Sequence, residues 1–336
     1  MMNVTSKSGS VLIAVLWSLF FLAALALVIN AYITPQLSLA ASLRDRTVLR
    51  YLAEAGVQRS LLELRSDETE EFDALNSSWA DNEEAFKEIY LTNSGYFSVE
   101  HSAAAEEEES EKRYGLIDEE RKINVNTAPV DVLTRLFVGA GGGSDQEAKE
   151  IAESIADWRD GDDEAMDNGA ESNYYEGLAA PYACKNANFN ILEELLLVKG
   201  VTEEIFDHVK GYVTVYGTGA VNINTADEAA LQWLGIGDDL AKEIVDYRNG
   251  QDGQGATEDD NVFENAQSLI PDLSTKLSLS AEDIEKLTGV QNAGLLGVRS
   301  DYFRGESYGR FQDKEAGFKI TFVVNRDETI RFWKEL

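Results

Sequence analysis

The chain has 336 residues, and its 29 Lys and Arg against 61 Asp and Glu give it a formal net charge of −32. At about 100–200 residues per domain, this length predicts two domains or one domain with a large insertion. Hydrophobic residues make up 44% of the chain, so the composition excludes wholesale disorder. The acidity argues against nucleic acid as a partner, because phosphate binding depends mainly on Lys and Arg.

Side chains that commonly catalyse reactions or bind zinc are scarce. Cys184 is the one cysteine, so the sequence has no internal disulfide and no Cys-x-x-Cys zinc site. His101 and His208 are the two histidines, and neither has a nucleophile beside it in the sequence. Gly139–Gly143 is not followed by the Lys-Ser/Thr of a phosphate-binding loop. The sequence therefore predicts a protein that is not an enzyme.

The N-terminal segment predicts a membrane anchor. No charged side chain lies between Lys7 and Arg44, and residues 10–33 form an apolar run of 24 residues. As a helix this run is about 36 Å long, enough to cross a bilayer. A cleaved secretory signal has a shorter apolar region of about 7–15 residues. We therefore expect a retained transmembrane helix, continued by a further helical segment over residues 34–66.

The residues before the anchor resemble a type IV prepilin leader. Residues 1–9 are mostly polar and end in Lys7-Ser8-Gly9, and the apolar run begins at once with Ser10. In such leaders a membrane aspartyl peptidase cuts after the glycine, where a backbone without Cβ can approach the protease closely. The resemblance implies cleavage between Gly9 and Ser10 and a methylated N-terminus. An ordinary signal anchor with a glycine at this place is the alternative.

The fifth residue of the processed chain would be Ala14. Most pilin-like subunits carry Glu there, where it is thought to meet the N-terminal amine of the subunit ahead. A carboxylate in hydrocarbon is costly unless it is paired. Ala14 therefore marks a subunit that has none ahead of it, at the tip of a fibre.

The charges that flank the anchor would by themselves predict a C-terminal domain in the cytoplasm. Arg44, Arg46 and Arg50 follow the apolar run, and positive residues usually stay in the cytoplasm. Long domains cross the membrane largely regardless of such charges. The leader therefore favours a translocated C-terminal domain.

The body of the chain carries an internal repeat. Residues 123–133 (INVNTAPVDVL) align with residues 221–231 (VNINTADEAAL), and both contain N-x-N-T-A. Each copy continues into a helical stretch that ends in a similar signature, IADWRDG at 155–161 and IVDYRNG at 244–250. Thr127 and Thr225 are the expected N-caps. Two further helical blocks are expected over 189–212 and 263–291.

The flanks of this helical region alternate as strands. The pattern predicts strands at 96–101 and 114–118, around the acidic insert 103–112, and again at 301–312, 317–325 and 329–333. Strands on both sides of a helical block predict one antiparallel sheet interrupted by an inserted domain. The expected fold class is α+β, with a long N-terminal helix on a small antiparallel sheet and a large inserted all-α domain of two related modules. The expected boundaries are a leader at 1–9, a transmembrane helix at 10–33, its continuation at 34–66, a split pilin-like domain at 67–120 and 293–336, and the insertion at 121–292.

Together these features resemble minor pseudopilin K of the type II secretion system, the general secretion pathway protein K family. The resemblance covers essentially the whole chain. It is carried by the Gly9/Ser10 leader, Ala14 in place of Glu, the two N-x-N-T-A copies at 124–128 and 222–226, DWRD at 157–160, GAE at 169–171 and Tyr174-Tyr175.

The resemblance implies a structural role in protein export. The chain would be a single-pass bacterial inner-membrane protein with its C-terminal domain in the periplasm. It would form the tip of the pseudopilus with minor pseudopilins I and J, and with H as a further partner. The prepilin peptidase and the inner-membrane secretion platform would also engage it.

An acidic loop predicts a calcium site. Residues 157–171 (DWRDGDDEAMDNGAE) carry seven carboxylates, and counting from Asp160 the carboxylates at positions 1, 3, 5 and 12 have the spacing of an EF-hand loop. Ala165 replaces the glycine of that loop at position 6, and a solvated acidic loop is the alternative. Known K pseudopilins bind calcium in their helical domain, which favours calcium here. The candidate ligands are Asp160, Asp162, Asp163, Glu164, Asp167, Asn168 and Glu171.

The alternative function is that of a membrane-tethered DNA-binding protein. Residues 221–248 resemble the helix-hairpin-helix of competence-type DNA receptors, in which the backbone of Gly235–Gly237 would hold a phosphate. Asp238 and Asp239 follow directly, where cations would be needed. The sequence therefore favours a structural use of this hairpin.

Overall fold

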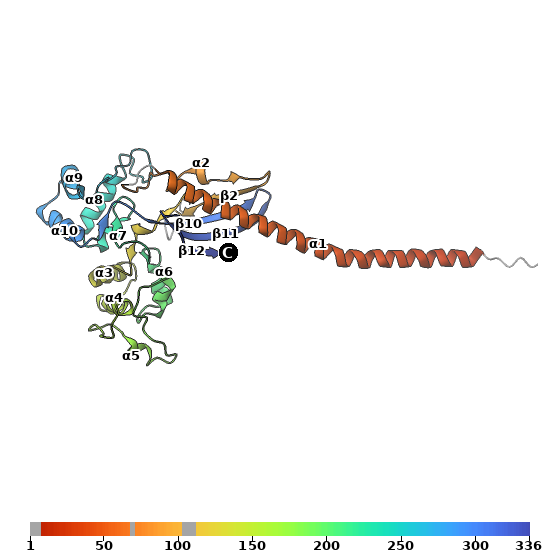
Figure 1. The fold of residues 1–336 in the computed structure, drawn as a ribbon, viewed down its shortest axis with the longest axis horizontal. Helices are drawn as coiled ribbons and strands as arrows, with labels where there is room; N and C mark the ends of the chain where they lie inside the picture. The colour runs from red at the N-terminus through yellow and green to blue at the C-terminus, as the bar shows by residue number, and fades with distance from the viewer. Residues whose placement is uncertain (1–7, 68–70, 103–111) are drawn as a thin grey trace, which may run out of the picture.

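The computed structural model describes residues 8–67, 71–102 and 112–336, so most of the predicted leader and the insert at 103–111 lie outside the described residues. Helix α1 (Ser8–Ser66) runs without a break through the apolar segment, with Pro35 inside it. It is the one helix in the described part that is long and apolar enough to cross a membrane. In Figure 1 its N-terminal half projects away from the rest of the molecule, and its C-terminal half lies against the sheet.

An antiparallel sheet packs against the second half of α1. Every neighbouring pair of strands in it is antiparallel, and β5 pairs with one end of β10. The long strands come from the C-terminal segment and the short ones from the segment after α1, which confirms a sheet built from both sides of an insertion. Its order is β1 (Ile89–Tyr90), β2 (Gly95–Val99), β10 (Tyr302–Phe311), β11 (Lys314–Asn325) and β12 (Ile330–Glu335), with β5 at Ile117–Asp118.

Close backbone contact holds α1 on the sheet. A Cβ at Gly309 in β10 would stand 1.9 Å from the carbonyl oxygen of Leu49, so only glycine allows the helix to approach this far. Leu52, Ala53 and Val57 on the same helix are buried against the sheet. Burial at about 25 cal/mol per Å² of apolar surface makes this face a main source of stability for the domain. Short elements complete it: α2 (Glu83–Phe86), β3 (His101–Ser102) and β4 (Lys112–Arg113).

The insertion consists of two modules with the same order of elements. Each begins with a short strand at its N-x-N-T-A copy, continues through two helices, and returns through further helical turns to a second short strand. After η1 (Glu119–Arg121), the first module contains β6 (Ile123–Asn124), α3 (Val130–Gly139), α4 (Asp145–Arg159), α5 (Ser172–Tyr175), η2 (Leu192–Leu197), α6 (Glu203–Val209) and β7 (Val213–Thr214). The second contains β8 (Val221–Asn222), α7 (Glu228–Trp233), α8 (Asp238–Arg248), α9 (Leu269–Lys276), α10 (Ala281–Asn292) and β9 (Leu296–Gly297).

Both modules close in the same way, with a parallel pairing of two-residue strands. Ile123 pairs with Val213 in the first module, and Val221 pairs with Leu296 in the second. The expectation of two related helical modules is confirmed, and these strand pairs add a small β component to an insertion expected to be all-α.

The second asparagine of N-x-N-T-A has the same structural role in both copies of the repeat. Asn126 donates to Phe189 O (3.1 Å) and accepts from Phe189 N (2.7 Å). Asn224 makes the same pair of bonds with Phe263 (2.9 Å each). Each second asparagine thus holds the returning segment of its own module. Buried polar groups of this kind stabilise a fold only when they are fully bonded.

The arginines of the two signatures, Arg159 and Arg248, also have the same structural role. Arg159 donates to the carbonyl oxygens of Val125 and Ala128, and Arg248 donates to the carbonyl oxygens of Ile223 and Ala226. In both modules the end of the second helix is therefore fixed to the turn that follows the short strand.

The predicted threonine caps are wrong. Helix α3 begins after Pro129, which has no side-chain cap bond, and α7 begins after Asp227, whose carboxylate accepts from Ala230 N (2.8 Å). The Thr225 hydroxyl instead donates to Asp118 (2.5 Å), which lies 107 residues earlier in the chain. A tertiary hydrogen bond has replaced the local one.

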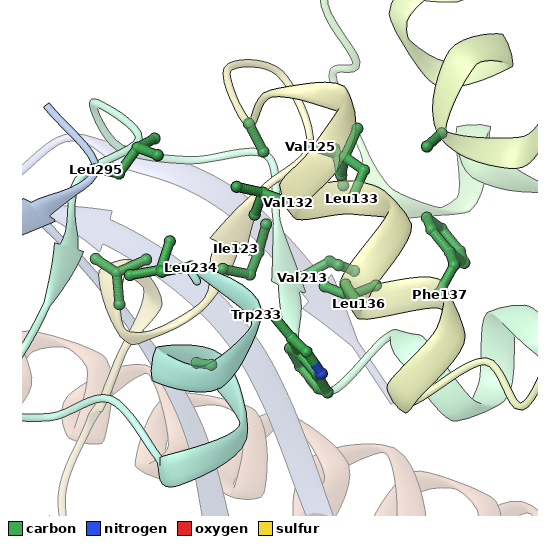
Figure 2. Close-up of a cluster of buried hydrophobic side chains, with 14 of the residues drawn as sticks. Ile123, Val125, Val132, Leu133, Leu136, Phe137, Val213, Trp233, Leu234 and Leu295 are labelled. Atoms are coloured by element: carbon green, nitrogen blue, oxygen red, sulfur yellow. The ribbon is translucent and has the colours of Figure 1, made fainter. Parts of the chain in front are cut away.

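The two modules share one core. Figure 2 shows Leu133 and Leu136 of α3 facing the short-strand residues Ile123 and Val213, with Trp233 of the second module packed beside them. A Cβ at Gly139 would stand 2.4 Å from Nε1 of Trp233, so the end of α3 lies directly on that ring. The insertion is therefore one packed body.

Candidate functional site

The predicted membrane segment and its marker residue lie on the free half of α1. Ala14 is exposed there, and its carbonyl oxygen accepts a hydrogen bond from the Ser18 hydroxyl (2.9 Å). Ser10 is also exposed and helical, and Gly9 lies in the same helix. Large apolar side chains along this half are about half exposed or more, as Leu12 is at 63% and Phe20 at 62%. No other described part of the chain packs against this surface.

The acidic loop lies at the outer end of the first module, between α4 and α5. Helix α4 begins with a capping box between Ser144 and Glu147 and ends at Arg159. Asp160 is its C-cap, and Glu171 is the N-cap residue of α5. The loop thus leaves one helix end and returns to another, which brings its two ends close together.

Three carboxylates meet where the loop closes. Asp157, Asp160 and Glu171 each offer an oxygen, and the three oxygens lie within 4.8 Å of one another. Asp157 is fully buried and Glu171 is 3% exposed. Neither oxygen of Glu171 accepts a hydrogen bond from an N–H or O–H group of the described residues. A buried carboxylate left in this way is costly without a cation or a proton.

Burial and neighbouring carboxylates raise the pKa values of two members of this cluster, Glu171 and Asp157. Burial, together with the charges of Asp157 and Asp160, raises the pKa of Glu171 to about 7. Burial also raises the pKa of Asp157, and the backbone N–H of Met166, which donates to both of its oxygens (3.2 and 3.1 Å), offsets only part of this. Like charges held this close favour a protonated form unless a cation is bound.

Two of the predicted ligands, Asp160 and Glu171, belong to this cluster, and the remaining five lie outside it. Asp162 accepts from Glu164 N (2.9 Å), and Asp163 accepts from Ser172 and Asn186. Asn168 donates to Glu153 (3.0 Å). Exposed residues among the five are Asp162, Asp163, Glu164 and Asp167.

The residue that the predicted ligand set omits is Asp157. It lies in the last turn of α4, three residues before Asp160, and residues three apart share one face of a helix. The EF-hand spacing starts only at Asp160 and so passes over it. The i, i+3 pair of carboxylates at the helix end was the signal that could have found it.

A glycine, a lysine and an aromatic cluster hold the loop in place. A Cβ at Gly169 would stand 1.9 Å from Asp157 Oδ2. Lys199 donates to the carbonyl oxygens of Asn168 (3.0 Å) and Gly169 (3.4 Å). Beneath the loop, the rings of Trp158 and Tyr175 meet edge to face with their centroids 5.1 Å apart. The cluster is therefore built on a packed base.

The donor set fits a hard cation. All three groups are carboxylates, and calcium takes six to eight oxygen ligands in irregular loops. The buried oxygens of Glu171 receive no N–H or O–H donor and meet only the weakly donating thiol of Cys184, and this favours a cation over a merely solvated loop. When bound, calcium would neutralise the cluster and join the end of α4 to the start of α5.

The hairpin that resembles a DNA-binding motif is packed inside the insertion. Gly235 and Gly237 both have positive φ (93° and 103°), and Ile236 between them is fully buried. Asp238 and Asp239 occupy the first turn of α8. The turn is followed at once by acidic residues, where a bound phosphate would need cations.

Comparison with known proteins finds similar chains over part of the sequence. Residues 108–218 match the family model of type II secretion system protein K, first domain. The chain is 35% identical over 99 residues to the putative type II secretion system protein K of Escherichia coli K12, covering 29% of each chain. It is 27% identical over 201 residues to type II secretion system protein K of Aeromonas hydrophila, covering 57% of this chain and 55% of the relative.

A third relative and one solved structure agree. Type II secretion system protein K of Pseudomonas aeruginosa is 29% identical over 205 residues, covering 60% of this chain and 58% of the relative. The sequence matches thus span from under a third to under two thirds of the curated relatives' length. The structure of the GspK-GspI-GspJ complex from enterotoxigenic Escherichia coli matches with a TM-score of 0.62 and 18% identity, covering 89% of this chain and 99% of that one. This last match shows a shared fold, and the sequence comparisons show that residues 108–218 match the first domain of type II secretion system protein K and that the chain is similar to proteins of that name.

Proposed function

We propose that the chain is a minor pseudopilin that occupies the tip of the type II secretion pseudopilus. In this role it initiates or caps assembly of the fibre and so supports protein export across the outer membrane. The observation that carries the proposal is the position of the insertion: in Figure 1 its second module lies beyond the C-terminal end of α1, opposite the free apolar half. The role is structural rather than chemical.

The free half of α1 supplies the surface for assembly. Exposed apolar side chains such as Leu16 (58%) and Leu27 (71%) run along it. In the membrane they face lipid, and in a fibre the same side chains pack against the helices of other subunits. Ala14 on this half brings no carboxylate to pair with a subunit ahead. A bulky insertion at the opposite end agrees with such a leading subunit.

The structural neighbour supports the choice of partners. That neighbour is a protein K solved in complex with GspI and GspJ. We propose minor pseudopilins I and J as direct partners of this chain, with H joining below them. The prepilin peptidase would process the leader, and the inner-membrane secretion platform would add the subunit to the fibre.

The charges after the apolar run make contacts within the folded domain. Arg50 forms ion pairs with Glu335 (2.9 Å) and Glu54 (3.3 Å). Arg46 lies over the ring of Phe318 at 5.9 Å, and Asp45 pairs with Lys314. Long domains cross the membrane largely regardless of positive charges beside the apolar run. We propose a single-pass inner-membrane protein with its folded domain in the periplasm.

Calcium in the acidic loop would stabilise the insertion. Asp157, Asp160 and Glu171 are the groups that would hold it, with the carbonyl oxygens of the loop available to complete the shell. A cation that binds only the folded chain stabilises it by about 2.7 kcal/mol at a hundredfold excess over Kd. The loop joins α4 to α5, so calcium there would order the connection between these two helices.

Immunogold labelling of assembled pseudopili tests the leading position. The full chain with a C-terminal epitope should label one end of each fibre, and labelling along the length would contradict the proposal. Co-purification from detergent extracts should recover I and J with the chain. Binding of labelled duplex DNA near 150 mM salt is the readout for the competence-type alternative, and we expect none because of the acidic residues at the hairpin.

A further inference from the structure

A basic cavity lies at the junction between the sheet domain and the second module. Its volume is about 180 Å³, and it is lined by Trp79 from the sheet domain and by Arg248 from the end of α8. Arg113, Arg121 and His101 also line it, and Asp118 is the one acidic side chain among its described lining residues. Such a group of cations is unexpected in a chain with 61 acidic and 29 basic residues.

The arginines of this cavity have no carboxylate partner. Arg248 is 6% exposed, and its Nε has no hydrogen-bond partner among the described residues. A terminal nitrogen of Arg248 donates to backbone carbonyl oxygens. A terminal nitrogen of Arg113 likewise donates to the carbonyl oxygen of Gly255 (2.8 Å). Arg121 makes no hydrogen bond with any described residue, and none of the three joins an ion pair within the described chain. A buried guanidinium without an anion is costly.

Asp118 does not neutralise these charges, because its oxygens are already used. Its Oδ2 accepts from Asn222 (3.1 Å), Thr225 (2.5 Å) and Ser300 (2.6 Å). Its Oδ1 accepts from the backbone N–H of Glu120 (2.7 Å). These four donors fix the carboxylate within the junction and away from an ion pair with the cavity arginines.

The internal repeat shows what is missing here. In the first module Arg159, the equivalent of Arg248, is followed by Asp160, and in the second module the equivalent residue is Asn249. The carboxylate of Asp160 acts to raise the pKa of Arg159, although burial has the larger effect and lowers it. Burial and the nearby charge of Arg121 lower the pKa of Arg248 to about 10, which Asp260 and Asp227 offset only in part. In the sequence, the second module thus has the arginine without the carboxylate that directly follows it in the first module.

A second buried donor lines the same cavity. Trp79 is 1% exposed, and its Nε1 has no hydrogen-bond partner among the described residues. Buried N–H groups of this kind are normally bonded. An indole N–H and guanidinium N–H groups around one space are the donors that recognise oxyanions, since Arg binds carboxylate and phosphate with two parallel bonds.

We propose that this cavity binds one small oxyanion of the phosphate or carboxylate class, held by Arg248, Arg121 and the Trp79 indole. The anion would link the sheet domain to the second module and fix the insertion on its base. The site is separate from the acidic loop of the first module. It does not depend on the role of the chain in the fibre, because it is read from the junction alone.

Thermal unfolding of the full chain in detergent, with sodium phosphate added at constant ionic strength, tests the site. Phosphate should raise the melting temperature relative to chloride, and the midpoint of this rise gives Kd. Arg121→Gln should weaken phosphate binding about tenfold or more, because a charge-assisted bond is lost. Arg331→Gln is the matched control, since Arg331 is exposed on β12. Equal weakening in both variants would overturn the site in favour of general charge attraction.

Asn249→Asp is the sharper variant, because it restores the arrangement of the first module. The new carboxylate should raise the melting temperature without phosphate and remove most of the phosphate response. An unchanged phosphate response in Asn249→Asp would overturn the proposal. It would also be overturned if phosphate had no effect on the melting temperature of either the unsubstituted chain or the variant with five Glu→Gln changes that is described in the next paragraph.

The anion can come from solution or from this chain, and one further variant separates these sources. The sequence 103–111 contains five glutamates, at 106–109 and 111. In a chain with these five changed to Gln, a phosphate response that becomes stronger indicates that a side-chain carboxylate competes for the cavity. An equal response in both chains indicates a free anion. Either result supports an oxyanion site, provided that Arg121→Gln weakens it.

Discussion

Gly169 lies so close to Asp157 that a Cβ on the glycine would stand 1.9 Å from the Oδ2 of the carboxylate. The contact joins the end of the acidic loop to the last turn of α4. Asp157 is fully buried there and meets Asp160 and Glu171 within the carboxylate cluster. The glycine therefore sets the position of the carboxylate that the proposed calcium site depends on most.

Gly169→Ala should remove most of the stabilisation that calcium provides. The added methyl group has to displace Asp157, so the calcium-dependent part of about 2.7 kcal/mol at a hundredfold excess should fall by more than half. Melting temperatures of the full chain in detergent, with calcium and with a chelator, measure this. Gly161→Ala is the matched control, because a Cβ there meets nothing within 4 Å. Loss of the calcium effect in both variants would contradict the specific role of Gly169.

Two carboxylate substitutions separate the observed cluster from the EF-hand spacing. Asp157→Asn should abolish most of the calcium-induced rise in melting temperature, because it weakens a buried member of the cluster. Asp162→Ala should keep that rise, since Asp162 is exposed and its oxygen caps a turn at Glu164. The reverse result would restore the ligand set of an EF-hand loop. Magnesium should replace calcium poorly in the unsubstituted chain, because it prefers smaller octahedral shells and keeps its waters.

Calcium-free stability should fall as pH rises through the range set by Glu171. Burial and the neighbouring carboxylates raise its pKa to about 7, from an ordinary value of 4.5. Between these values the folded chain holds a proton on Glu171 that the unfolded chain has released, so the contribution of Glu171 to stability is greatest below pH 4.5 and declines up to about 7. Melting temperatures with a chelator at several pH values between 4.5 and 7.5 measure this slope.

Glu171→Gln should flatten that slope in part. Asp73 also has its pKa raised to about 7, chiefly by burial, and it acts in the same direction from the domain junction. Asp73→Asn therefore serves as the companion variant, and each substitution should remove its own share. Calcium should stabilise the chain more at pH 7 than at pH 5, because its ligands must be deprotonated. An unaltered slope in Glu171→Gln would show that this carboxylate does not titrate as the structure indicates.

The large features of the fold could be predicted because they rest on periodic patterns. The long apolar run predicts the free half of α1, and the two N-x-N-T-A copies predict two modules. Helix starts were harder, as Thr225 shows. Its hydroxyl donates to Asp118, 107 residues away, while Asp227 caps the helix instead. A local preference of about 1 kcal/mol for a cap is easily overridden by a buried bond to a charged group.

The acidic loop shows that residue spacing also predicts a candidate site only in part. Spacing in the sequence selects Asp160 and Glu171 and also selects Asp162 and Glu164, which the structure leaves exposed. Glu171 differs from these two in its burial, which depends on the aromatic base under the loop, whereas Asp160 joins the cluster through its position as the C-cap of α4. Asp157 belongs to a helix in the sequence pattern, so counting along the loop does not reach it.

Processing of the leader is a direct test of the prepilin-like interpretation. We expect cleavage between Gly9 and Ser10, so the membrane-extracted chain should begin at Ser10 by N-terminal sequencing and by intact mass. Gly9→Leu should leave uncut precursor, because a bulky side chain keeps the backbone out of the peptidase. A chain that retains Met1, or one cut after residue 30, would contradict the interpretation.

Position five of the processed chain tests the place at the tip. Ala14 is exposed on the free half of α1, so Glu at this place makes no internal clash, and the fold should be unchanged. A carboxylate there costs roughly 2.5–3.5 kcal/mol in the membrane unless a partner amine meets it. A leading subunit has no such partner ahead. Ala14→Glu should therefore leave secretion unchanged or reduce it, while Ala14→Ser controls for a small polar change at the same site. Secretion of a reporter substrate, normalised to the amount of the chain in the membrane, is the measurement. A clear gain of secretion with Ala14→Glu would mean that the subunit benefits from a neighbour ahead of it, and the chain would then belong within the fibre rather than at its tip.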